Sequence, residues 1–309
     1  MINRELIRIK EVQAVYSFCL NEGMKFQTAE NELLKSLSLS YDLYNQLLLL
    51  LVEVHRMAAS ILEIREHRSQ RLGDGTVYGK RFVENRFLLQ LASNKQLRKY
   101  AEVPRFSWVN YSDFVRSLYK SIEDSAAFQE YMSESEDTFQ ADREVCRKLY
   151  KTLLCSNDDL DEILEAECIY WNDDKTIVDT FVLKTINRFT EETTPDQPLL
   201  PEFKSEEDRE FAITLLHRSI SNSEYYQSLI AKTTRRWDVN RVALMDRVIL
   251  QVALAEIISF PTIPVSVSIN EYLEIAKVYG SLSSSKYINA TLDAIVKMLR
   301  EEGKLLKKE

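Results

Sequence analysis

Apolar positions recur every three or four residues along most of the chain, which is the pattern of amphipathic helices. The N-terminal stretch RELIRIKEVQAVYSFCL shows it clearly, with Asn3 placed to cap a helix over residues 4–20 and Gly23 placed beyond its end. The same spacing predicts a second helix over residues 28–37 and a third, apolar on most sides and therefore buried, over 41–68.

The C-terminal third predicts three more helices. The first runs from about residue 240 to residue 259, before two prolines, and is apolar enough to be central. The second ends at Gly280, and the third has Ser285 as its candidate N-cap and Gly303 past its end. Six Gly and six Pro in 309 residues leave few helix breakers. The sequence therefore predicts an all-α protein, a helical bundle with an additional central helical region.

Two segments interrupt the helical pattern. One is Val103-Pro104, because the residue before a proline is driven away from helical dihedral angles. The other is TTPDQPLLPEF, whose three prolines exclude a helix interior, and which we interpret as a linker.

A glycine-bearing stretch, LGDGTVYGK, precedes Arg81. A phosphate-binding loop would need Gly at the position of Asp74 and Ser or Thr at that of Arg81. The match fails, and an exposed turn is the simpler interpretation.

Charge is distributed unevenly around a net value of −8. Residues 61–120 carry 12 Lys and Arg against 6 acids, a net +6, whereas residues 121–210 carry 9 against 25, a net −16. The basic segment either extends an anion-binding surface or pairs with the acidic segment beside it. Attraction between opposite charges in one chain favours the second interpretation.

Chemistry-bearing residues are scattered. The four cysteines form no Cys-x-x-Cys pair, and the three histidines have no carboxylate or cysteine at ligand spacing, so we expect no metal, no cofactor and no catalysis. Charged residues in the first turns leave no apolar leader, and the run from Leu47 to Val52 is too short to cross a bilayer. These features favour a cytoplasmic protein.

An internal repeat emerges when the chain is shifted by 66 positions. Asp142-Arg143-Glu144 then falls on Asp208-Arg209-Glu210, and Trp171 falls on Trp237. Helical periodicity alone aligns apolar positions, so coincidence is one explanation, but a diverged duplication accounts for the polar matches as well.

Three pieces near the C-terminus lie in register over about 95 residues: RWDVNRVALMDRVIL, the stretch INEYLEIAKVYG and the stretch KYINATLDAI. Together they resemble the NusB family of transcription antitermination factors. The N-terminal NRELIRIKEVQAVY is similar to the arginine-rich first helix of that family, with Gln13 to Tyr16 matching and Glu5 and Leu6 at positions that are often basic.

The resemblance implies a non-catalytic, RNA-binding transcription antitermination factor of ribosomal RNA operons. Its implied partners are boxA-type RNA, the small-subunit ribosomal protein NusE and the RNA polymerase antitermination complex. Arg4 and Arg8 share a helix face and, with Lys286 at the start of the last helix, are candidates for phosphate contacts. Asn289 lies in the motif of the last helix and is a candidate for a hydrogen bond to RNA, or equally a packing residue.

The implied organisation has three parts. Residues 1–64 and 201–309 match the family, and residues 65–200 form a helical insertion, basic over 65–120 and acidic over 121–200, which includes the possible diverged repeat of 205–260. One alternative function is a protein-interaction scaffold that has lost RNA binding. Another is an accessory module for ribosomal RNA modification, although no glycine-rich cofactor loop or catalytic cysteine accompanies it.

Overall fold

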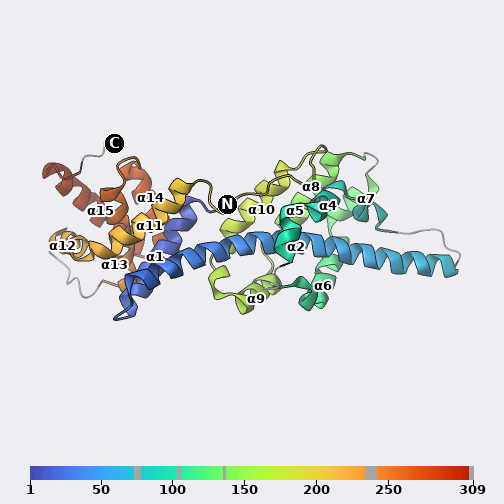
Figure 1. Cartoon of the computed structure of the whole chain (residues 1–309), viewed down its shortest axis with the longest axis horizontal. Coiled ribbons are helices and arrows are strands. Elements are labelled where there is room, and N and C mark those ends of the chain that lie inside the picture. Colours follow the sequence, from blue (N-terminus) through green and yellow to red (C-terminus); the bar gives the residue numbers. More distant parts are fainter. Residues whose placement is uncertain (73–77, 103–105, 135–136, 234–241, 306–309) are drawn as a thin grey trace. The chain divides into compact units, whose positions relative to one another are not determined.

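The computed structural model describes residues 1–72, 78–102, 106–134, 137–233 and 242–305 (Figure 1). Within these ranges the chain is helical and has no strand, only an isolated bridge between Ile2 and Phe203. The all-α prediction is confirmed. The chain divides into two compact units: unit 1 comprises Met1 and residues 38–202, and unit 2 comprises residues 2–37 and 203–309.

Unit 2 is a bundle around one buried helix. Apart from the first turns of α2 (Phe26–Leu72), its helices are α1 (Arg4–Leu20), α11 (Glu206–Ser221), α12 (Ser223–Thr233), α13 (Leu244–Ser259), α14 (Val265–Tyr279) and α15 (Ser284–Glu301). Consecutive residues from Val248 to Ile257 are buried, because α13 contacts α1, α11, α12, α14 and α15. This all-round burial confirms the prediction that the helix ending at residue 259 is central.

The ends of these helices follow local capping chemistry. Asn3 accepts a hydrogen bond from the backbone N–H of Leu6 at 2.9 Å, so α1 begins where the sequence predicts. Helix α14 ends at Gly280, also as predicted. The predicted cap of the last helix was wrong by two residues, since α15 begins at Ser284 after Ser283.

Unit 1 contains the rest of α2 and shorter segments around it. They are α3 (Lys80–Val83), α4 (Arg86–Ser93), α5 (Lys95–Ala101), η1 (Trp108–Tyr111), α6 (Ser112–Glu123), α7 (Ala126–Ser133), α8 (Phe139–Leu149), η2 (Tyr150–Leu154), α9 (Asp158–Glu167), η3 (Ile169–Trp171) and α10 (Lys175–Arg188). The two helices predicted over 28–37 and 41–68 are one continuous helix, α2. Between the two predicted ranges, Ser40 is buried and donates its hydroxyl to Asp174 at 2.6 Å.

Residues 190–202, called the strap below, hold the three prolines and form no helix, as the prolines predict. They are not a free linker. Lys95 donates its backbone N–H to the carbonyl of Pro195 at 2.9 Å, and Tyr41 donates its hydroxyl to that of Leu200 at 3.0 Å. The strap is therefore bonded to α2 and α5 within unit 1.

Helix bounds also repeat at the 66-residue offset. Shifted by 66, α8 begins one residue before α11 and α9 begins one residue after α12. The duplication, and the three-part division of the chain, stay predictions. Trp237, residues 73–77 of the glycine-bearing stretch and the break at Val103-Pro104 lie outside the described residues.

Candidate nucleic-acid interface

The candidate residues Arg4 and Arg8 lie one turn apart on α1 in unit 2, and the structure treats them differently. Arg8 is almost fully buried, with 5% of its side chain exposed. Its guanidinium donates to both carboxylate oxygens of Glu256, at 2.8 and 2.9 Å, and to Glu271 at 3.0 Å. Such a bidentate pair is strong and directional, so Arg8 holds α1 against α13 and α14.

Glu256 is the centre of this buried cluster. It also accepts hydrogen bonds from the hydroxyls of Ser268 at 2.7 Å and Tyr272 at 3.0 Å. Burial alone would lower the pKa of the Arg8 guanidinium, but the hydrogen bonds and the charge of Glu256 raise it, and the net shift is upward. Arg8 is thus held in its charged form.

Sequence reasoning missed Glu256 and Glu271 as partners of Arg8. A signal was available, because Glu256 is the one carboxylate in an otherwise apolar run, and such a residue is rarely buried unless it is paired. Neither residue could be matched to Arg8 by spacing, since Glu256 lies 248 positions away.

A second buried carboxylate lies on α1 itself. Glu11 is fully buried, and neither of its oxygens has a hydrogen-bond partner. Burial raises the pKa of this carboxyl well above 4.5, and the negative charge of Glu256 adds to the rise.

Arg4 remains accessible. Its side chain is 38% exposed, its Nε donates to Asp208 at 3.1 Å, and its guanidinium lies 5.0 Å from the ring centroid of Phe211. The pair is only partly exposed, because Asp208 is buried, but the accessible side of the Arg4 guanidinium can meet a second anion while the pair with Asp208 persists.

Lys286 and Asn289 lie in the first two turns of α15. Lys286 is exposed and Asn289 is half-buried. Ser283, at the start of this helix, forms no side-chain cap, and the backbone N–H groups at a helix start attract anions. Helices α1 and α15 both pack against α13 and α14, which places all four candidate residues in one bundle.

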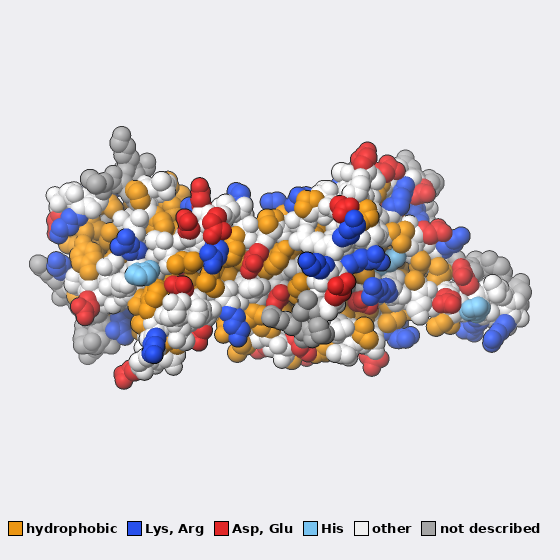
Figure 2. All heavy atoms as spheres, in the orientation of Figure 1, with side chains coloured by type: hydrophobic (Ala, Val, Ile, Leu, Met, Phe, Trp, Pro, Cys, Tyr) orange, Lys and Arg blue, Asp and Glu red, His pale blue; other side chains and the backbone are white. Residues whose placement is uncertain are grey.

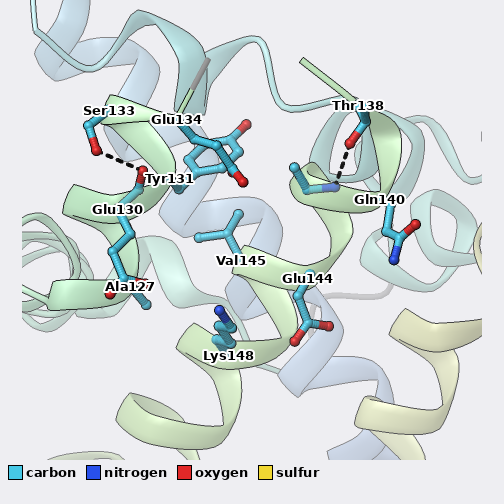
Figure 3. Close-up of a pocket in the computed structure, with 11 residues that line it drawn as sticks. Ala127, Glu130, Tyr131, Ser133, Glu134, Thr138, Gln140, Glu144, Val145 and Lys148 are labelled. Atoms are coloured by element: carbon cyan, nitrogen blue, oxygen red, sulfur yellow. Dashed lines mark hydrogen bonds between the residues drawn. The ribbon is translucent and has the colours of Figure 1, made fainter. Parts of the chain in front are cut away.

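A pocket in unit 1 is of the opposite character. It has a volume of about 640 Å³ and lies between α7 and α8, where Figure 3 shows Glu130, Glu134 and Glu144 with Lys148 around it. Three carboxylates against one ammonium repel phosphate groups, so we exclude this pocket as an RNA site.

Among the described residues, no group of three His, Cys, Asp or Glu side chains could hold a metal ion. Burial raises the pKa of the thiols of Cys19, Cys146 and Cys155, which makes them poor nucleophiles. No described helix has both the length and the hydropathy of a membrane span.

Comparison with known proteins identifies the C-terminal part. The NusB family model matches residues 177–297. A transcription antitermination protein NusB from Koribacter versatilis is 43% identical over 99 residues, which are 32% of this chain and 68% of that protein. The NusB proteins of Chloroherpeton thalassium and Salinibacter ruber are 35% and 34% identical over 99 residues, 32% of this chain in each case and 47% and 62% of those proteins.

A solved structure of NusB from T. maritima is 29% identical and covers 40% of this chain and 78% of that one, with a TM-score of 0.30. A TM-score this low adds nothing to the assignment, which rests on the sequence matches. Fold and matches define the class of protein, an all-helical protein of a non-enzymatic family. The chain belongs to the NusB family, as the C-terminal motifs predicted.

Proposed function

We propose that this protein is a transcription antitermination factor that binds boxA-type RNA of ribosomal RNA operons together with NusE, within the RNA polymerase antitermination complex. The observation that carries the proposal is the 43% identity over 99 residues to a relative named for transcription antitermination. A cytoplasmic location goes with this role.

The RNA surface proposed is on unit 2. Arg4 and Lys286 are exposed cations, and Asn289 offers an amide to a base or a 2′-hydroxyl. Arg8 enters the proposal as a positioning residue, because its pair with Glu256 fixes the α1 backbone that carries Arg4.

The test measures affinity of the full chain for a boxA-containing single-stranded RNA, with and without NusE, across a range of salt concentrations. Changing Arg4→Ala together with Lys286→Ala removes two cations from the proposed RNA surface. The log-log salt slope should then become shallower by about 0.7 for each phosphate that is no longer neutralised.

Lys297→Ala is the matched control. Lys297 is exposed on α15, three turns and about 16 Å beyond Lys286 on the same face, so its replacement removes a positive charge from the same helix but away from its first turns. If the double variant and the control bind alike, the proposed surface is wrong.

A second candidate function is the scaffold that has lost RNA binding. One observation favours it: the two family-like arginines of α1 each face an acid, Asp208 for Arg4 and Glu256 for Arg8. If this second function is correct, the full chain should bind NusE but should bind boxA RNA no better than an unrelated RNA of equal length.

A further inference from the structure

A second pocket in unit 1 has a different lining from the acidic one. It measures about 300 Å³ and lies between α2, α5 and η1. Its walls include three aromatic residues, Tyr100, Phe106 and Trp108. The volume is at the lower end of the range for small-ligand sites, about 300–1,000 Å³.

The aromatic wall is fixed by the backbone of α2. Trp108 is buried and donates its indole N–H to the carbonyl of Gln46 at 2.8 Å. Phe106 packs edge-on against it, with ring centroids 4.8 Å apart, and is only half-buried. A rigid ring that is partly open to solvent is a stacking surface for another planar group.

Gln46 supplies an unused polar group to the same pocket. Its side chain lines the pocket and is 2% exposed, and its Oε1 has no hydrogen-bond partner. Its Nε2 faces the carbonyl of Phe106 at 3.5 Å and the hydroxyl of Tyr100 at 3.4 Å, both at the limit of hydrogen bonding. A buried amide oxygen without a donor is costly, and a ligand N–H would satisfy it.

Two arginines line this pocket. Arg98 is exposed and forms no ion pair among the described residues. Arg56 is 65% exposed and pairs with Glu53, its neighbour one turn earlier on α2. Figure 2 shows Lys and Arg side chains gathered on the face where α2 and α5 lie. Glu53 also lines the pocket and offsets the charge of Arg56, so the pocket combines aromatic rings, an unsatisfied acceptor and the positive charge of Arg98.

We propose that this pocket binds one nucleotide of single-stranded RNA, with the base stacked on Phe106, a base N–H donated to Oε1 of Gln46, and a flanking phosphate on Arg98. The four standard bases all carry an N–H donor on their pairing edge, and stacking accepts any of them. The inference takes its ligand class from the proposed function but uses residues of unit 1 alone.

The experiment is crosslinking of the full chain to single-stranded RNA that carries 4-thiouridine at one position, followed by mapping of the attached peptide. We expect attachment within the segment that includes Phe106 and Trp108, and none when the RNA is presented as a duplex, whose bases cannot be splayed out. Attachment confined to unit 2 would overturn the proposal.

Affinity for the same single-stranded RNA gives the second readout. Phe106→Leu keeps an apolar side chain but removes the ring, and should weaken binding about tenfold. Arg98→Ala should make the salt slope shallower by about 0.7, whereas Arg116→Ala, an exposed arginine of α6 outside the pocket, should not change it. Equal affinities for Phe106→Leu and the unmodified chain would also overturn the proposal.

These outcomes separate the two RNA surfaces. Loss of binding in the Arg4→Ala, Lys286→Ala double variant with no effect of Phe106→Leu leaves the unit 2 surface standing and removes the pocket. The reverse result leaves the pocket standing and removes the unit 2 surface. If a peptide bound this pocket saturably and RNA did not compete with it, the pocket would instead be a protein-binding site.

Discussion

Helix α4 in unit 1 and helix α1 in unit 2 begin in the same way. Each has an Asn cap, Asn85 or Asn3, whose side chain accepts from the backbone N–H three residues on. Each then has an Arg at its first position that pairs with an Asp, Arg86 with Asp142 and Arg4 with Asp208. The two aspartates lie 66 positions apart, at the offset of the sequence repeat.

The units differ one turn further along these helices. Where unit 2 has Arg8 bonded to Glu256, unit 1 has Gln90, whose amide donates to the carbonyl of Thr190 at 3.0 Å. Where unit 2 has the buried Glu11, unit 1 has Ser93. The start of the helix is therefore a packing device present in both units, whereas buried ionisable groups at the following turns of this helix belong to unit 2.

Removing the buried charge should have the largest effect. Arg8→Met leaves Glu256 buried without its cation, so we expect a loss of about 3–5 kcal/mol in the free energy of unfolding, measured by urea denaturation. Gln90→Met at the corresponding place in unit 1 removes a neutral hydrogen bond and should cost about 1 kcal/mol. Similar losses for the two variants would contradict the distinction between the units.

The second largest effect concerns Glu11 and depends on pH. Since its folded pKa is raised, the folded state retains a proton that the unfolded chain loses above pH 4.5, and stability falls as pH rises through this window. Glu11→Gln has no such titration. Its stability advantage should grow by up to about 1.4 kcal/mol per pH unit above 4.5 until Glu11 ionises in the folded chain, and disappear below it. If the free energies of unfolding of Glu11→Gln and of the unmodified chain changed in parallel with pH, a raised pKa of Glu11 would be refuted.

Replacing the aspartates of the two first-turn pairs should cost moderately different amounts of stability. Asp142 is buried and accepts from the hydroxyl of Tyr131 at 2.6 Å as well as from Arg86. Asp142→Asn should therefore cost about 2–3 kcal/mol, and Asp208→Asn, at a position that is also buried but lacks a bond like that from Tyr131, about 1 kcal/mol. Thermal unfolding at neutral pH measures both, and a larger loss for Asp208→Asn would reverse the interpretation.

Replacing the two asparagine caps should give the smallest difference in stability loss. Asn3→Ala removes a helix cap only, at about 1 kcal/mol. Asn85 also donates its side-chain amide to the carbonyl of Asp142 at 2.9 Å, so Asn85→Ala should cost about 2 kcal/mol. Urea denaturation of the two variants measures the difference, and equal losses would show that this buried amide bond adds nothing to the cap.

Much of the fold could be predicted from local pattern, because capping and periodicity act within a few residues. The bounds of α1, the burial of α13 and the end of α14 at Gly280 are of this kind. The continuity of α2 was not predictable, because the partner of Ser40 lies 134 positions away. A serine in a helix interior favours a break unless its hydroxyl bonds a group other than the local backbone.

The candidate site was predictable only in part. Arg4 and Lys286 could be chosen as exposed cations from helix position and family likeness. The burial of Arg8 could not be predicted in this way. An arginine on an amphipathic helix is expected at the surface unless a distant carboxylate is known to pair with it. Gln46 gave no signal at all, since its significance is an unsatisfied oxygen in a pocket whose aromatic residues, Tyr100, Phe106 and Trp108, lie more than 50 positions away.

The strap has a consequence for protease digestion. Proteases bind their substrates as extended backbone, which usually requires local unfolding of the target segment, and a proline-rich connection between helices would ordinarily be cut first. Here the backbone groups that a protease would use are already bonded to α2 and α5 at Pro195 and Leu200. Resistance of this segment to nicking is thus set by the opening of unit 1, not by the exposure of its prolines.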